Sequence, residues 1–575
     1  MGVTTRKSRF DSRSTSSEYY DDDTGTSTIE LFTASKDTYR VAPFGKIPLP
    51  WPYSHGMASE KAAEMREIFE IVVQEILQKY HVTSSTTRVM RMWRRGLHST
   101  AKDTLIISTD DTDTTMWSFA VDDIYDTVSP WATEVGLPFR VEIRNQILMY
   151  TDISTAPLYE EGVEDVMSQI EPVILAKVKS LISDSWKSVT VHGRQPLTAP
   201  RGDRDSNTTT VVILVQKGAV SLWDYVEEQL CQIVDGIAPP GMRIALEILP
   251  ANFVPSVVVD MEPGPPKTLI DVPSAPTNGS SIAPQSIRTE ARSMGPVVMF
   301  KPAGSSRQYK AFLTCYHVVA PGDERNSDWN DNHGIGFNDL PRPPIRMSWP
   351  ARYDVECTMT DYARKIADGT NTQEFCARKM LERATFAGRF PPSATIGEVL
   401  YASGKTHNAQ GNKMDWALIV FNPAGPGDGA KNELPLPVVI PEPFNTRNDK
   451  FEYEARPGDV VSGIGKPDPK YPVRSTWVGY VGRSSGAVGG QVVKLSNPVR
   501  WADGTTTPEI EVASLASGIN FTTGGDSGSL VFDFHHRWVG MVITAETFQG
   551  LGYITAADAI IEDIERRTGG KLTLL

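Results

Sequence analysis

Hydrophobic positions divide the chain into two blocks with different periodicity. Before about residue 260, apolar residues recur every three or four positions and alternate with short apolar runs, which predicts amphipathic helices between strands. After about residue 296, many short apolar runs are separated by Gly, Pro and Asp, a pattern typical of an all-β domain. The chain is therefore predicted to be multidomain.

The first block contains the same order of predicted elements twice. A helix, a strand, a helix that begins at a tryptophan and a second strand fill residues 41–155, and this order returns in residues 156–261. We therefore predict two tandem α/β sandwich repeats. Trp117 and Trp223 occupy equivalent positions, where core packing is favoured and ligand stacking is the alternative. We expect this block to recognise a regulatory partner, whose chemistry the pattern does not reveal.

The second block, residues 291–575, predicts short β-strands interrupted by a helical insertion at about 353–383 and closed by a helix from Ala556 to Arg567. The predicted strands are Val297–Phe300, Trp416–Phe421, Val460–Ile464, Trp477–Val481, Gln491–Leu495, Glu509–Val512, Ser529–Phe532 and Val539–Ile543.

Two further segments have compositions unlike the blocks beside them. Residues 1–40 are rich in Ser, Thr, Asp and Arg, which predicts a disordered tail. Residues 262–290 are rich in Pro, with Gly and Ser between, which predicts a linker.

Charge and cysteine content limit the possible partners and compartment. The 575 residues carry a formal net charge of −13, which argues against a nucleic-acid-binding surface as the main function. No run approaches the roughly 20 apolar residues of a membrane span, and the N-terminus lacks the apolar core of a signal peptide. Four cysteines are too few for a disulfide framework, so we expect an intracellular, cytoplasmic protein.

The segment Gly524–Leu530 carries the strongest chemical signal in the chain. It lies between two strand-like runs, where glycines allow Ser527 to be presented on a tight turn. A serine nucleophile needs a base, and the oxyanion that develops needs backbone N–H donors. His317 follows an apolar run that would hold an imidazole in place. The orienting carboxylate is expected at Asp415, which begins a hydrophobic run; Asp354 is the alternative, but it falls in the helical insertion.

Three segments together resemble the signatures of chymotrypsin-fold (trypsin-like) serine proteases. They are Leu-Thr-x-x-His-Val at 313–318, Asp-x-Ala-Leu at 415–418 and Gly-Asp-Ser-Gly-Ser at 525–529, in that family's order. Residues 538–543 resemble the strand that lines the family's substrate cleft. The resemblance covers about residues 290–575 and implies an all-β double β-barrel with a C-terminal helix.

The resemblance also implies roles for individual residues. Ser527 would attack the scissile carbonyl, His317 would transfer the proton, and Asp415 would hold the imidazole in the right tautomer. The backbone N–H groups of Gly525 and Ser527 would form the oxyanion hole. The implied activity is a serine endopeptidase acting on protein or peptide substrates, with neither a cofactor nor a metal.

This sequence departs from the family pattern in ways that bear on activation. Val318 and Thr523 stand where secreted animal members commonly have cysteines, which agrees with an intracellular protein. No activation sequence precedes the domain. Secreted members use a freed N-terminal amine to pair with the acid before the nucleophile, which is Asp526 here. Asp526 therefore needs another partner, or the oxyanion loop needs ordering by something else, such as the N-terminal repeats.

The expected substrate pocket contains no acidic residue. The resemblance places Phe521 at its floor with Thr522 beside it, and Thr544 and Ala545 along the cleft wall. Because a buried cation needs a counter-charge, a preference for Lys or Arg before the cut is disfavoured. We expect an uncharged residue there.

Three other interpretations compete with an active protease. A pseudoprotease that only binds a partner stays open. An α/β-hydrolase esterase is disfavoured, because those enzymes order the triad as Ser, acid and His. A zinc site at His535 and His536 is disfavoured, because no paired cysteines stand at ligand spacing.

Overall fold

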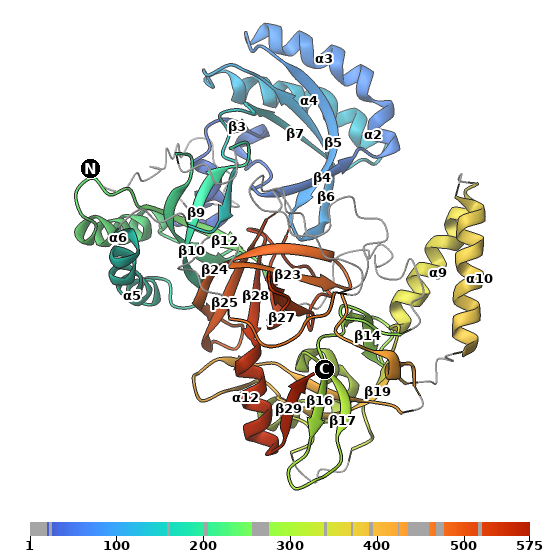
Figure 1. The fold of residues 1–575 in the computed structure, drawn as a ribbon. Helices are drawn as coiled ribbons and strands as arrows, with labels where there is room; N and C mark the ends of the chain where they lie inside the picture. The colour runs from blue at the N-terminus through green and yellow to red at the C-terminus, as the bar shows by residue number, and fades with distance from the viewer. Residues whose placement is uncertain are drawn as a thin grey trace. The chain divides into compact units, whose positions relative to one another are not determined.

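The computed structural model divides the chain into two compact units, residues 1–252 with 500–505, and residues 253–499 with 506–575 (Figure 1). The described residues are 20–21, 26–157, 162–199, 205–255, 275–337, 342–369, 372–389, 395–423, 425–434, 459–466, 476–515 and 520–575. None of the helices in these ranges combines the length and apolar character needed to cross a bilayer.

The first half of the first unit is a five-stranded sheet with two long helices, α3 (Arg66–Lys79) and α4 (Trp117–Glu134). The strand order is β3 (Arg40–Val41), β7 (Phe139–Arg144), β6 (Leu97–Ser108), β5 (Thr86–Arg94) and β4 (Tyr53–Met57). β6 and β7 run parallel, with Leu105 opposite Val141, as expected for strands joined by a crossover helix. Trp117 is fully buried in the core between helices and sheet.

The second half of this unit repeats the order helix, two strands, helix, strand. Here α5 (Val163–Leu181) precedes β9 (Trp186–Pro196) and β10 (Thr208–Gln216), and α6 (Trp223–Ile237) precedes β12 (Ala245–Ala251). β10 pairs antiparallel with β9 and parallel with β12. Trp223 is also buried, and its indole N–H donates to the Ser27 carbonyl at 2.8 Å. Both tryptophans therefore pack in cores, and the predicted domain boundaries stay predictions.

Part of the predicted N-terminal tail has regular structure. β2 (Thr26–Thr28) leads into α1 (Ile29–Ser35), and the Thr28 hydroxyl caps the helix by accepting from the Leu31 N–H at 3.3 Å. Ile29 and Phe32 are buried in the core that contains Trp223. The rest of the predicted tail before Thr26, apart from Tyr20–Asp21, lies outside the described residues.

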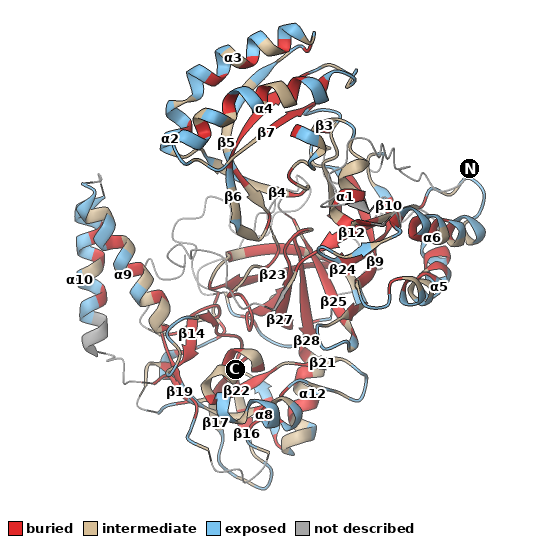
Figure 2. Cartoon of the chain, turned by 180° about the vertical axis from the view of Figure 1, so that it is seen from behind, coloured by how far each residue is buried: buried red, intermediate tan, exposed pale blue. Residues whose placement is uncertain are grey.

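The second unit is mostly β-sheet. Its first sheet has the order β15-β14-β18-β19-β22-β17-β16-β29, with bounds Arg292–Ser293, Ser281–Pro284, Arg346–Ser348, Gly397–Ala402, Ala417–Phe421, Tyr309–Thr314, Val297–Lys301 and Lys571–Leu574. In its second set of strands, the order is β24-β23-β26-β27-β28-β25, with bounds Gly486–Arg500, Trp477–Gly482, Leu530–Asp533, Trp538–Glu546, Leu551–Ala556 and Thr506–Ser514. An additional pairing of β24 with β25 joins the two ends of this second path. Figure 2 shows β23 and β27 as buried strands.

Helices occupy the two places where the sequence predicts them in this unit. α9 (Arg352–Ala367) and α10 (Gln373–Arg389) form the insertion, and α12 (Ala557–Thr568) lies near the C-terminus. The predicted strand Val460–Ile464 is wrong, because only isolated bridges form there, at Val460 and Ile464. The predicted linker overlaps β14, while residues 256–274 lie outside the described part of the chain.

Candidate active site

The turn that carries Ser527 is fixed by two glycines in the left-handed region of φ. Gly525 has φ +99° and Gly528 has φ +90°. A Cβ at Gly528 would lie 2.2 Å from Thr314 Oγ1 and 2.6 Å from the Ser293 carbonyl oxygen, so no larger residue fits. The Ser293 hydroxyl in turn donates to the Gly525 carbonyl at 3.0 Å. The tight turn expected from the glycines therefore packs directly against strands of the other sheet.

His317 and Asp415 come together because their strands are neighbours. His317 lies in α7 (Tyr316–Val319), just after β17, and Asp415 lies just before β22. β17 and β22 pair antiparallel with Thr314 opposite Ala417, which places both side chains at the same end of the pair. His317 Nδ1 lies 2.6 Å from Asp415 Oδ2, and the His317 backbone N–H donates to Asp415 Oδ1 at 3.0 Å. Asp354, the alternative acid, pairs with Arg483 instead.

Burial and charge oppose each other at Asp415. Burial alone would raise the pKa of its carboxyl, but the charge and hydrogen bonds of His317, with the nearby Lys413 charge, hold the pKa below its usual range. Asp415 is therefore ionised at neutral pH. The carboxylate fixes the proton of His317 on Nδ1, which leaves Nε2 as the basic nitrogen.

The His317 segment and the nucleophile turn meet at one carbonyl group. Both the Cys315 thiol, at 3.2 Å, and the Gly528 N–H, at 2.9 Å, donate to the Val542 carbonyl. His317 Nε2 is buried and has no hydrogen-bond partner among the described residues. The Ser527 hydroxyl donates to the Ile543 carbonyl at 3.3 Å. The hydrogen bond from Ser527 to His317 is thus not formed in this state, and rotation of the hydroxyl would be needed to make it.

Asp526, the residue whose partner the sequence left open, is enclosed by hydrogen-bond donors from its own unit. Its Oδ1 accepts from the backbone N–H groups of Ser484 and Ser485, both at 3.0 Å. Its Oδ2 accepts from the Tyr480 hydroxyl and the Thr523 N–H, both at 3.0 Å, and from the Ser485 hydroxyl. Such donors stabilise a buried carboxylate without a counter-charge. No freed amine is required to hold this loop.

A buried ion pair is adjacent to the hydrogen-bond donors that surround Asp526, which we call the cage of Asp526. Arg483 precedes the two serines of the cage, and its Nε donates to Asp354 Oδ2 at 2.7 Å. Asp354 belongs to the first turn of α9 and also accepts from the Ser281 hydroxyl. Both charged side chains are almost fully buried. The helical insertion is therefore bound to the segment that holds Asp526.

The four residues predicted to line a substrate pocket are all buried. Phe521 belongs to a hydrophobic core cluster, and its ring packs edge-on against Tyr480 with centroids 5.1 Å apart. Thr522, Thr544 and Ala545 are at most 1 % exposed. Their roles in substrate binding stay predictions, and Phe521 contributes to core packing in this state.

The Cys315 thiol lies close to the His317–Asp415 pair. Ligand atoms of these three residues lie within 4.8 Å of one another. Burial raises the pKa of the Cys315 thiol well above its usual range, and the thiol already donates to Val542. A neutral, hydrogen-bonded thiol is a poor metal ligand, so this arrangement fits a carboxylate that orients His317 better than it fits metal binding.

A buried acid that interacts with Asp415 was not recognised in the sequence. Glu509, in β25, accepts from the Thr507 hydroxyl at 2.5 Å. Burial raises its pKa from the usual 4.5 to about 8, although Thr507 and Lys413 oppose the shift; Asp415 adds to it. The alternating pattern of β25 could have marked an inward-facing acid, but nothing in the sequence fixes its proximity to Asp415.

Replacing Glu509 with Gln should change how stability depends on pH. The folded-state pKa is raised, so the folded protein retains a proton that the unfolded chain releases between about pH 4.5 and 8. This group therefore lowers the unfolding free energy by about 1.4 kcal/mol for each pH unit across that window. Glu509→Gln should remove that slope, as measured by urea unfolding at pH 5 and pH 8. The exposed Glu562→Gln should leave it in place, and parallel curves for wild type and Glu509→Gln would contradict the assignment.

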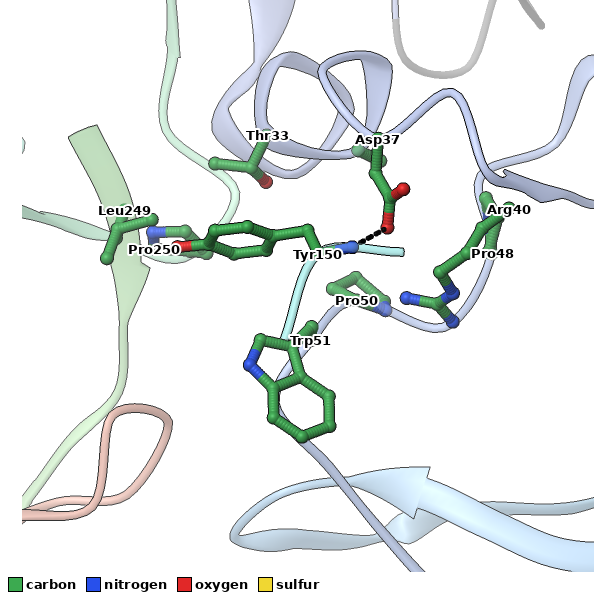
Figure 3. A pocket seen from close by; sticks show the side chains of 10 residues that line it. Thr33, Asp37, Arg40, Pro48, Pro50, Trp51, Tyr150, Leu249 and Pro250 are labelled. Atoms are coloured by element: carbon green, nitrogen blue, oxygen red, sulfur yellow. Dashed lines mark hydrogen bonds between the residues drawn. The ribbon is translucent and has the colours of Figure 1, made fainter. Parts of the chain in front are cut away.

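The first unit has a small cavity lined by residues from both of its halves (Figure 3). Its volume is about 30 Å³, enough for about one water molecule. The Tyr150 backbone N–H donates there to Asp37 Oδ2 at 3.1 Å, drawn as a dashed line. The cavity is too small for a larger ligand, and a regulatory partner for this unit stays a prediction.

Comparisons with known proteins give likenesses in structure but none in sequence. No family model and no curated protein match the chain. Solved structures similar to about half of it include protease A from Thermobifida fusca, a Nocardiopsis protease and a chymotrypsin from Cellulomonas bogoriensis. Their identities are 13 %, 11 % and 14 %, and their TM-scores are 0.26, 0.25 and 0.24. Each match covers 52 % of this chain and 98 %, 98 % and 97 % of the other.

These structures are all proteases, and the expected resemblance to chymotrypsin-fold serine proteases is found over about half of the chain. With identities and TM-scores this low, the matches carry no weight for the chemistry of the site. The chemistry has to follow from the geometry of His317, Asp415 and Ser527.

Proposed function

We propose that this protein is a serine endopeptidase, with Ser527 as nucleophile, His317 as general base and Asp415 as the residue that orients His317. One observation carries the proposal: Asp415 binds both the ring Nδ1 and the backbone N–H of His317, which leaves a buried, unpaired Nε2 on the base. Cys315, two residues before this base, donates to the same Val542 carbonyl as the Gly528 N–H of the nucleophile turn, and a base held beside that turn suits proton transfer from a serine.

The reaction follows from these positions. Ser527 Oγ forms a bond to the carbonyl carbon of the substrate as its proton passes to His317 Nε2. The peptide C–N bond then breaks, and His317 gives the proton to the leaving amine. Water, activated by the same nitrogen, cleaves the acyl ester and restores Ser527. The charge on the oxyanion would be stabilised by backbone N–H groups of Gly525 and Ser527, and the Gly525 N–H has no hydrogen-bond partner among the described residues.

Covalent labelling tests the proposal directly. The full chain, incubated with a small fluorophosphonate over hours, should become labelled once per molecule, on Ser527. Ser527→Ala should remain unlabelled, and Ser527→Ala should also abolish release of fluorescent peptides from labelled casein. The adjacent Ser529→Ala is the matched control, and we expect it to retain the label. Absence of labelling in the wild type would favour a pseudoprotease that uses this unit for binding only.

A further inference from the structure

One edge of β27 is shared by the nucleophile turn and by a strand from far earlier in the chain. β28 pairs with the other edge of β27 from Gly540 to Glu546. On the shared edge, β26 pairs first, with Leu530 opposite Met541. Val542 then bonds to the turn, accepting from the Gly528 N–H and donating to the Ser529 carbonyl at 3.1 Å. Beyond Val542, another strand takes the place of β26 along this edge of β27.

The strand that occupies this position is β13 (Phe253–Pro255), the first segment of the second unit. It pairs antiparallel with β27, with Phe253, Val254 and Pro255 opposite Glu546, Ala545 and Thr544. β13 therefore runs toward Ile543, whose carbonyl accepts the hydrogen bond from Ser527. The β27–β28 ladder shifts register between Val542 and Thr544, at Ile543. Pro255, the last residue of β13, lies opposite Thr544, which is the neighbour in β27 of Ile543.

Burial and packing show how closely this edge is covered. Ser527, Ala545 and Glu546 are 0 % exposed, so an extended substrate has no access to them in this state. The Phe253 ring stacks on Tyr553, with centroids 5.3 Å apart and the planes 26° from parallel. The Tyr553 hydroxyl is itself fixed, donating to the buried Glu511 at 2.8 Å. β13 is thus held by main-chain pairing and by one aromatic contact.

We propose that β13 is an intramolecular occupant of the cleft along β27, and that it holds the Thr544–Glu546 positions with which an extended peptide substrate would pair. This inference rests on the proposed protease function. Peptides that add a strand to a sheet edge gain affinity from main-chain hydrogen bonds, and side chains that meet neighbouring rings add specificity. The favoured substrates are extended peptides with an aromatic residue positioned to stack on Tyr553. Cleavage requires that such a peptide displaces β13.

Competition within one chain has a kinetic signature. The tethered strand is present at a high effective concentration, so only a fraction of molecules has a free edge. Because the other molecules have β13 on the edge, the apparent KM for a peptide is raised. The value of kcat is unchanged, because a saturating substrate displaces β13 completely. A change that only loosened the fold would instead lower kcat.

Phe253→Ala should release the edge. Loss of the stack on Tyr553 should lower KM about threefold to tenfold at constant kcat, since aromatic pairs contribute about 0.5–1.5 kcal/mol. The probe is an internally quenched peptide with Phe-Val-Pro followed by an uncharged residue, assayed on the full chain. Phe375→Ala, which removes an exposed aromatic of α10 in the same unit, is the matched control and should leave KM unchanged.

A disulfide between β13 and β27 should lock the edge. Val254 and Ala545 are direct cross-strand partners, so Val254→Cys with Ala545→Cys brings two thiols to opposed positions. Oxidation should lower turnover of labelled casein by at least about tenfold, and dithiothreitol should restore it. The wild-type chain under the same treatment controls for the four native cysteines, three of which are buried.

The outcomes separate the two proposals. Lower KM in Phe253→Ala together with reversible loss of turnover in the locked form supports β13 as the occupant. Equal turnover in the released, wild-type and locked forms, with Ser527 still labelled by fluorophosphonate, would overturn the occupancy and leave the protease intact. No labelling and no turnover in any form would reject the protease, and the occupancy with it.

Discussion

Asp415→Asn is expected to lower kcat by about 10⁴-fold while leaving the fold in place. The asparagine side chain has nearly the same shape, and its oxygen can still accept from the His317 backbone N–H. Its amide group, however, would face His317 Nδ1 with a donor at the 2.6 Å contact. The imidazole would then carry its proton on Nε2, where it cannot accept the proton of Ser527. Steady-state turnover of labelled casein measures the loss.

Two further measurements identify the cause of this loss. Because the lowered pKa of Asp415 means that its carboxylate stabilises the folded state at neutral pH, its removal should lower the urea midpoint while unfolding stays cooperative. Asp361→Asn in the helical insertion replaces another acid of lowered pKa, paired with Arg364 and Lys365, and should leave kcat unchanged. A loss of less than about tenfold in Asp415→Asn would mean that Asp415 does not orient the base.

Asp526→Asn is expected to lower kcat by about 10²–10³-fold, the size of the loss caused by removing one oxyanion-hole donor. The groups that face Asp526 in its cage donate hydrogen bonds: the N–H groups of Ser484, Ser485 and Thr523, and the hydroxyls of Tyr480, Ser485 and Thr523. An amide nitrogen placed among them would repel at least one donor. The loop would shift, and the Gly525 and Ser527 N–H groups would move with it.

The measurement has to separate a displaced loop from a lost nucleophile. Asp526→Asn should slow turnover while His317 and Asp415 keep their contact, so the proton resonance of His317 Nδ1–H, followed by NMR, should persist. The matched control is Asp533→Asn, a buried acid at the end of β26 that accepts from the His535 and Arg537 N–H groups. It lies outside the loop and should leave kcat within about twofold. Wild-type turnover in Asp526→Asn would show that the oxyanion loop does not depend on the cage.

Sequence patterns predicted the helices and strands that are set by their own residues. They missed strands that form only by pairing with residues far along the chain. The amphipathic helix at α5 and the apolar strand at β22 follow from periodicity, and they formed near the expected bounds. β13 was placed in the N-terminal block because three residues before a Pro-rich stretch give no strand signal. Its pairing depends on β27, almost 300 positions later. Val460–Ile464 has the composition of a strand but finds only isolated bridges.

The same distinction applies to the site. His317, Asp415 and Ser527 could be proposed because each lies in a short motif, and the structure brings His317 and Asp415 into contact. The partners of Asp526 could not, since Tyr480, Ser484 and Ser485 lie 41 to 46 positions before it and are ordinary strand and turn residues. Phe521 has the position of a pocket residue in its motif, yet its neighbours on β23, β25 and β28 enclose it in the core.

The contact of Ser293 with the nucleophile turn has a consequence for folding. It joins residues 232 positions apart, and the contact of His317 with Asp415 joins residues 98 positions apart. Closing such long loops is slow, because chain entropy is lost before the contacts that compensate for it can form. A nascent or refolding chain therefore has its helices well before it has a competent nucleophile. In the proposed protease, His317, Asp415 and Ser527 would come together only after both sheets of the second unit have assembled, so the partly folded chain would be protected from its own chemistry.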